Sequence, residues 1–126
     1  MPSSDEDSRR RSHVQVGRDY EVRAAEFFKS KQYEIVEQNW RAGRREIDLI
    51  VRKGNQLVFV EVKASRGTSF GHPAEWIDTR KIELLTEAAR AYLAENGITG
   101  VDIRFDVVTF TEGKLEHYPN AFDAQA

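Results

Sequence analysis

The chain has 126 residues, of which 40% are hydrophobic and 32% charged, with a formal net charge of -2 and no cysteine. This length fits a single domain, which we place at residues 16–122 between polar tails at 1–15 and 123–126. The missing cysteines exclude disulfides and thiolate metal sites and fit a reducing, cytoplasmic setting. The apolar runs are far too short to cross a membrane, so we expect no membrane partner.

The pattern of apolar residues predicts both helices and strands. In chain order these are a helix at 17–31, a strand at 33–40, a hairpin of two strands within 46–63, a helix at 78–95, a strand at 103–110 and a short strand at 115–118. Asp78 is the expected N-cap of the second helix. Its buried stripe is expected to hold Leu84, Leu85, Ala88, Tyr92 and Leu93. This order predicts an α/β sandwich in which helices cover the faces of a central mixed sheet.

The hairpin between Glu46 and Lys63 is the most informative segment. Its predicted turn is Gly54-Asn55, because glycine at the first central position suits a two-residue turn. Pairing about this turn sets Asp48 opposite Glu61 and Glu46 opposite Lys63, and since strand side chains alternate, all four project from one face. The other face is expected to be apolar, built from Ile47, Leu49, Val51, Val58, Val60 and Val62.

Two carboxylates that face each other across a ladder repel unless a cation lies between them. The candidate cations are a divalent metal ion and the neighbouring Lys63. Asp48 and Glu61 would hold magnesium, with the Val62 carbonyl as a further ligand and manganese as an alternative metal. Such a site suits phosphodiester hydrolysis, in which Lys63 would either orient the attacking water or stabilise the charge that develops on phosphorus. The alternative is an ordinary charge network at an exposed end of the sheet.

The charge of the chain is unevenly distributed. The net charge of -2 argues against a strongly basic nucleic-acid-binding protein, yet the segment from Arg41 to Arg66 has seven basic residues and three acidic ones. A phosphate-rich partner would be attracted to this segment, and Arg41, Arg44 and Arg66 are the candidate contacts. Each of these arginines equally fits a routine place on a solvated rim.

Three further charged residues have two interpretations each. Glu46 either neutralises Lys63 or supports the metal. Glu21 shares a face with Ala24 on the first helix, and Lys81 falls on the buried stripe of the second. Glu21 and Lys81 therefore either take part in the site or form a mutual or nearby ion pair at the edge of the core.

Several segments together carry a family resemblance. They are Gly17-Arg18-Asp19-Tyr20-Glu21, Asn39-Trp40-Arg41, Glu46-Ile47-Asp48-Leu49-Ile50, Val58-Phe59-Val60-Glu61-Val62-Lys63, Phe70-Gly71, Lys81 and Arg104-Phe105-Asp106-Val107-Val108. The strand pair with Asp48 and Glu61-Val62-Lys63 resembles the PD-(D/E)xK signature of nucleases. The whole set, over residues 17–122, resembles the YraN-like family of small bacterial proteins.

The resemblance implies a restriction-endonuclease-like fold, a three-layer α/β/α sandwich similar to that of archaeal Holliday junction resolvases. It implies that Asp48, Glu61 and Lys63 occupy the catalytic positions. It also implies that Glu21 is a helix-borne acid near the metal, which Asp48 and Glu61 would hold with it.

The chain departs from the family pattern at two positions. Arg45 stands where the family usually has glycine, and Ile47 replaces the proline of the signature. Neither departure removes a metal ligand. Arg45 would instead alter the backbone at the strand entrance or narrow the access of a substrate.

Two functional hypotheses follow. The first is a magnesium-dependent endonuclease acting on DNA, with branched or irregular DNA as the substrate by resemblance to resolvases. A homodimer would then place two sites on opposed strands. The second is a non-catalytic nucleic-acid-binding or adaptor protein on the same scaffold, favoured by the small size and the net acidity.

Overall fold

The structure, a computed structural model, describes residues 19–65, 67 and 70–124. Its first helix covers residues 19–30. The elements that follow are β1 (Glu34–Ala42), β2 (Arg45–Lys53), β3 (Gln56–Ser65), the short 3-10 helix η1 (Pro73–Glu75), α2 (Thr79–Glu95), β4 (Asp102–Thr111) and β5 (Lys114–Phe122). Every predicted helix and strand is present, and β5 runs well beyond its expected end. The predicted tail at residues 1–15 lies outside the described residues.

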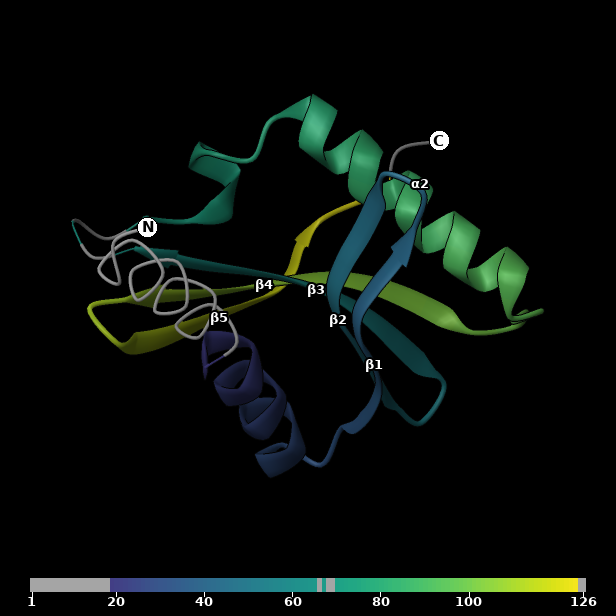
Figure 1. Cartoon of the computed structure of the whole chain (residues 1–126), viewed down its shortest axis with the longest axis horizontal. Coiled ribbons are helices and arrows are strands. Elements are labelled where there is room, and N and C mark those ends of the chain that lie inside the picture. The colour runs from purple at the N-terminus through teal and green to yellow at the C-terminus, as the bar shows by residue number, and fades with distance from the viewer. Residues whose placement is uncertain (1–18, 66, 68–69, 125–126) are drawn as a thin grey trace, which may run out of the picture.

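The strands form one sheet in the order β1-β2-β3-β4-β5. β3 and β4 are parallel, because α2 carries the chain from the end of β3 back to the start of β4. All other neighbours in the sheet are antiparallel. The first helix covers one face of the sheet and α2 covers the other (Figure 1). The predicted α/β/α sandwich with a central mixed sheet is therefore confirmed.

Two hydrophobic clusters, one on each face of the sheet, join the layers. The cluster under the first helix consists of Ala24, Ala25, Phe28, Leu49, Val51, Val58, Val60, Val108 and Phe110. The cluster under α2 consists of Ile47, Ile50, Leu57, Phe59, Leu85, Ala88, Ala89, Tyr92 and Phe105. Because helices cover the central strands on both sides, these strands read as nearly continuous apolar runs.

Helix α2 begins at the predicted cap but turns a slightly different stripe toward the sheet. The Oδ1 atom of Asp78 accepts a hydrogen bond from the backbone N–H of Lys81 at 2.9 Å, as an N-cap does. Leu84 was expected to be buried, yet 48% of it is exposed, whereas Ala89 is buried. The face of α2 that packs on the sheet is therefore centred on the buried Ala88 and Ala89, and Leu84 lies at the edge of this face.

The β2–β3 hairpin has the predicted register near its turn. The pairs from Lys53–Gln56 to Leu49–Val60 are those that the sequence predicts. Gly54 at the turn has a φ of 59°, a left-handed conformation that glycine adopts without steric cost.

The predicted pairing fails at the other end of this hairpin. Beyond Leu49–Val60 no pair joins the described residues of β2 and β3, because β2 continues with β1 while β3 continues with β4. The prediction of direct Asp48–Glu61 and Glu46–Lys63 pairs is therefore wrong. The two strands instead separate into a fork, formed by residues 45–48 of β2 and residues 61–65 of β3.

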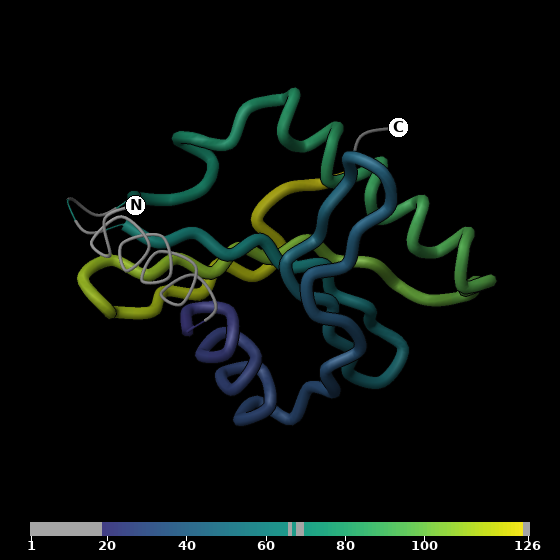
Figure 2. The backbone as a smooth tube through the Cα atoms, in the orientation of Figure 1, coloured from purple at the N-terminus to yellow at the C-terminus, as the bar shows by residue number. Residues whose placement is uncertain are grey.

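The predicted apolar face is also wrong for one residue. Ile47 packs under α2, whereas Leu49 packs under the first helix. The partner of Ile47 in β1 is Trp40, and the preceding Asn39 has a φ of 52°, which turns the strand at this point. The part of the β1–β2 hairpin beyond Asn39, hereafter the ribbon, lies against α2 (Figure 2). The rings of Trp40 and of Tyr92, which is near the C-terminal end of α2, are 5.3 Å apart.

A hydrogen-bonded network around the fully buried Asp106 joins β4 and β5, at the edge of the sheet opposite β1. Nε and Nη2 of Arg104 donate to its carboxylate at 2.7 and 2.8 Å, and Nε2 of His117 lies 2.7 Å from it. The backbone N–H of Asn120 donates to Oδ1 of Asp106 at 2.9 Å. Asn120 has a φ of 51°, and this hydrogen bond ties the end of β5 to β4. Burial raises the pKa of Asp106, but the hydrogen bonds from His117, Arg104 and Asn120 together lower it by more. The pKa therefore lies below its ordinary value.

We expect Asp106→Asn to lower the free energy of unfolding at neutral pH by about 3–5 kcal/mol, because it leaves the partly buried Arg104 without its fully buried counter-ion. Urea unfolding followed by circular dichroism measures this change. The loss should shrink as the solution is acidified through the folded pKa of Asp106, because the wild-type carboxylate then also loses its charge. The exposed Asp102→Asn serves as the control and should stay within about 0.5 kcal/mol of the wild type.

Candidate active site at the fork

Asp48 lies at the base of the fork and accepts a hydrogen bond from the opposite strand. Its Oδ2 atom is 2.8 Å from the backbone N of Val62, the donor. Where β2 and β3 separate, this N–H no longer has a ladder partner in β2, and the Asp48 carboxylate satisfies it. The hydrogen bond therefore fixes the carboxylate at the point of separation.

The electrostatic environment of Asp48 opposes its ionisation. Burial and the nearby charge of Glu61 raise its pKa from 3.8 to about 7, against the lowering effect of the Val62 hydrogen bond. The charges of Glu46 and Glu21 contribute to this rise by smaller amounts. Asp48 thus shares one field with three other acids, and this field is incompletely compensated by the positive groups around it.

Glu61 is mostly buried and forms an ion pair with α2. Its side chain is 11% exposed, and its Oε1 atom is 3.3 Å from Nζ of Lys81, in the first turn of α2. The predicted participation of Lys81 in an ion pair near the site is therefore found, with Glu61 rather than Glu21 as its partner.

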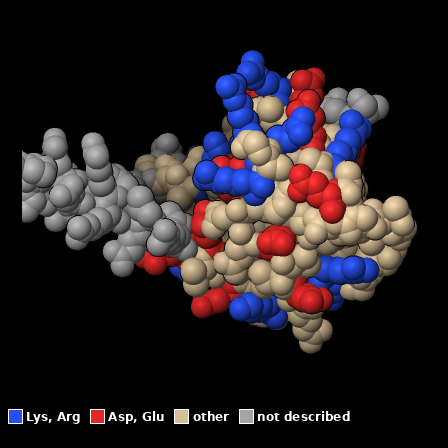
Figure 3. Space-filling view, turned by 45° about the vertical axis from the view of Figure 1, so that its right-hand side comes forward, with Lys and Arg blue, Asp and Glu red and all other residues tan. Residues whose placement is uncertain are grey.

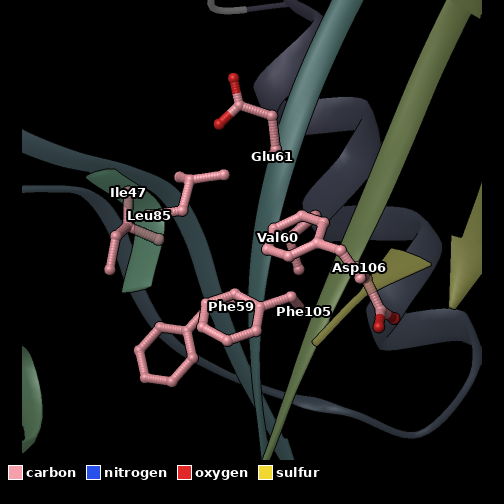
Figure 4. A pocket seen from close by; sticks show the side chains of 8 residues that line it. Ile47, Phe59, Val60, Glu61, Leu85, Phe105 and Asp106 are labelled. Carbon is pink, nitrogen blue, oxygen red and sulfur yellow. The ribbon is translucent and has the colours of Figure 1, made fainter. Parts of the chain in front are cut away.

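A small apolar pocket lies beside Glu61 at the base of the fork. Its lining residues are Ile47, Phe59, Val60, Glu61, Leu85, Phe105, Asp106 and Phe122. The carboxylate of Glu61 points away from the aromatic rings of this pocket, and Asp106 points to the other side of the sheet (Figure 4). The polar chemistry of the fork therefore lies at the rim of the pocket and not inside it.

Glu21 on the first helix is oriented by β1. Its Oε2 atom accepts a hydrogen bond of 2.8 Å from Nδ2 of Asn39, the residue with the left-handed backbone. In the sequence, Asn39 stands out only as part of a family segment, and no pattern gives it a role. Asparagine tolerates positive φ better than most residues, but this preference could not have shown that its side chain reaches Glu21.

Lys63 stands at the fork with a different partner from the one predicted. Its Nζ atom lies 5.4 Å from the centroid of the Trp76 ring, a cation–π distance. Within the described residues no ion pair of Lys63 is found, and Glu46 instead lies 3.4 Å from Nη2 of Arg41. Of the two interpretations of Glu46, the neutralisation of Lys63 is therefore wrong, because the fork separates the two strands that carry these residues.

The donor chemistry of the fork suits a hard divalent cation, although its ligands are not brought together. Carboxylates are the ligands that magnesium and manganese prefer, and Asp48, Glu61 and Glu21 supply three of them. The raised pKa of Asp48 indicates the negative field that such a cation would neutralise. In the described part of the chain, however, no group of three or more His, Cys, Asp or Glu side chains is arranged to hold a metal ion.

Two of the three predicted nucleic-acid contacts lie on the β1–β2 hairpin. Arg41 is 70% exposed at its side chain, Arg44 is exposed at the turn, and Arg66 lies outside the described residues. Arg45, which stands where the family usually has glycine, points toward α2, because its Nε atom lies 3.6 Å from the Oε2 atom of Glu87. Figure 3 shows basic side chains along the upper rim of one face, with acidic ones among them. Exposed ion pairs of this kind are weak, so these arginines can exchange partners at small cost.

Comparison with known proteins places the chain in a family. The profile of the uncharacterised protein family UPF0102 matches residues 20–110. The chain belongs to UPF0102. This confirms the resemblance to the YraN-like family, and the matched UPF0102 region contains every candidate site residue from Glu21 to Lys81.

Individual UPF0102 proteins align with most of the chain. One from Chromohalobacter salexigens is 42% identical over 128 residues, which cover 98% of this chain and 99% of that protein. One from Persephonella marina is 35% identical and covers 85% of this chain and 92% of its own. A third, from Chloroherpeton thalassium, is 42% identical over 77% of this chain and 75% of its own.

In the described residues no helix is long and apolar enough to cross a membrane.

We expect Asp48→Asn to stabilise the protein at alkaline pH. The folded pKa of about 7 lies above the ordinary value of 3.8, so the folded state binds a proton that the unfolded chain releases between these values. The stability of the wild type should therefore fall as the pH rises through this window. The variant, which keeps an acceptor for Val62, should be more stable by roughly 1–3 kcal/mol at about pH 8 and similar below about pH 4.

Urea unfolding of the wild type and the variant at a series of pH values measures this difference, in the presence of a chelator. The exposed Asp102→Asn removes the same charge elsewhere and should show no such pH dependence. A wild type that is as stable as Asp48→Asn at alkaline pH would contradict the assignment of an uncompensated carboxylate.

Proposed function

We propose that the protein is a metal-dependent endonuclease that hydrolyses phosphodiester bonds in DNA. The observation that carries this proposal is the group of acids at the fork, where burial and the negative field of the neighbouring acids together raise the pKa of Asp48 to about 7. Such a field attracts a divalent cation, and strongly perturbed carboxylates are typical of active sites. Membership of UPF0102 is consistent with this proposal but names no activity.

The residues of the fork would divide the chemistry among them. Asp48, Glu61 and Glu21 would hold magnesium or manganese, which when bound polarises the phosphate and lowers the pKa of a water molecule. Lys63 would place its ammonium beside the scissile phosphate and stabilise the negative charge that develops on the phosphoryl oxygens. For Lys63 this requires only that its side chain leave the partly buried ring of Trp76, a contact worth about 0.5–2 kcal/mol.

The β1–β2 hairpin would position the DNA. Its arginines Arg41 and Arg44 stand on the ribbon that forms one side of the fork, so a strand that enters the fork would pass them. Contacts to phosphate fix the position of DNA without reading its sequence. We therefore favour a substrate defined by shape, such as branched or irregular DNA. A homodimer would supply two forks for two strands.

Asp48→Asn and Glu61→Gln should each reduce magnesium-dependent cleavage by roughly 100-fold or more, because each removes a charged ligand and leaves the fold intact. Cleavage of a labelled four-way DNA junction and of a linear duplex, with magnesium or with a chelator, measures this effect. Glu34→Gln removes an exposed charge on β1, away from the fork, and should cleave like the wild type. Equal cleavage by the wild type and both variants would contradict the proposal.

The second candidate is a non-catalytic nucleic-acid-binding protein on the same scaffold. One observation favours it, since no group of three metal-ligating side chains is assembled within the described residues. In this case the acids of the fork would be dispensable for binding, and the arginines of the hairpin would be required.

If the hairpin contacts DNA, Arg44→Glu should weaken binding and make the dependence of log affinity on log salt concentration less steep by about 1 per lost phosphate contact. Fluorescence anisotropy of a labelled junction at several salt concentrations, with a chelator present, measures both. Arg52→Glu makes the same charge change near the Gly54 turn and is the matched control. An identical loss in both variants would indicate a general charge effect and not a contact by the hairpin.

A further inference from the structure

Lys81 and Lys63, the two lysines near the fork, contact different kinds of group. Nζ of Lys81 is 3.3 Å from Oε1 of Glu61, whereas Nζ of Lys63 lies over the ring of Trp76. Asp48 of the fork and Glu21 of the first helix accept hydrogen bonds from neutral donors, a backbone N–H and an asparagine amide respectively. Of the three candidate metal ligands in the described structure, Glu61 is therefore the one whose charge is matched by a full positive charge from the protein.

The backbone that carries Lys81 is held firmly. The N–H of Lys81 donates to the side chain of Asp78, the N-cap of α2, at 2.9 Å. This capping bond fixes the first turn of the helix, and the positive end of the helix dipole adds to the charge near Glu61. The ammonium therefore reaches Glu61 from a fixed base, while its own side chain, 42% exposed, keeps access to solvent.

The burial of Glu61 explains why it needs a cation in the free protein. A carboxylate that is only 11% exposed loses most of its hydration, and an ionised form persists only when it is paired. Lys81 supplies this pair with one positive charge. A divalent ion bound to the same oxygen atoms would supply two, and would repel the ammonium at this short distance.

We propose that Lys81 occupies the place of the metal at Glu61 in the free protein, so that a divalent cation binds by displacing its ammonium. The displaced ammonium is then available to the phosphate of the substrate at the same edge of the fork. This inference rests on the proposed metal site and adds to it a competing internal cation.

The test measures the binding of Mn²⁺ to the full chain by titration calorimetry, without DNA. Lys81→Met removes the ammonium but keeps a long side chain of high helix propensity, so we expect it to bind Mn²⁺ roughly 3- to 10-fold more tightly than the wild type. Lys81→Arg keeps the charge and should resemble the wild type. Arg80→Met removes one positive charge from the adjacent, exposed position of the same helical turn and controls for the general change in charge.

Three results decide the inference. Tighter binding in Lys81→Met, with Lys81→Arg and Arg80→Met within about twofold of the wild type, supports it. Binding by the wild type that Lys81→Met leaves unchanged or weakens overturns the inference but leaves the proposed metal site standing. No binding to the wild type or to Lys81→Met at millimolar Mn²⁺ overturns the proposed metal site and the inference together. Melting temperatures of all variants show whether each is folded.

Discussion

The separation of β2 from β3 is the constraint on which the rest of the fork depends. Up to Leu49–Val60 the two strands form an ordinary ladder buried between two helices, and beyond it each pairs only with its outer neighbour. The separation leaves the N–H of Val62 without a ladder partner, and the Asp48 carboxylate satisfies it. A side chain that completes the backbone hydrogen bonding of the sheet is held in place, so the position of the central acid follows from the topology.

The same separation determines how each charge at the fork is balanced. Because Glu46 and Lys63 stand on diverging strands, Glu46 pairs with Arg41 in its own ribbon and Lys63 turns to Trp76. Glu61 remains on the inner strand, where α2 offers Lys81. Asp48 has a hydrogen bond from the Val62 backbone but no full counter-charge, so its burial and the charge of Glu61 leave its pKa raised. An incompletely balanced carboxylate costs stability, which is reasonable at a site that would bind a cation.

The sequence predicted the parts of this arrangement that depend on local patterns. Apolar runs, the Gly54 turn and the Asp78 cap are short-range signals, and they located the strands, the hairpin register near its turn and the start of α2 correctly. The fork was missed because its cause is not local. Whether Asp48 lies opposite Glu61 depends on which outer strand each inner strand follows, and the left-handed Asn39 that turns the ribbon gives only a weak signal in sequence.

Two aspartates show why residue identity alone does not distinguish a site from a structural element. Asp48 and Asp106 both belong to family segments, and both lie on strands of the central sheet. Asp106 is fully buried, yet bonds from Arg104, His117 and Asn120 hold its pKa below the ordinary value, so its charge strengthens the fold. Asp48 has one backbone donor and three acids in its field, so its charge weakens the fold. The protein therefore balances the charge of Asp106 itself, whereas the charge of Asp48 would be balanced only by a bound cation.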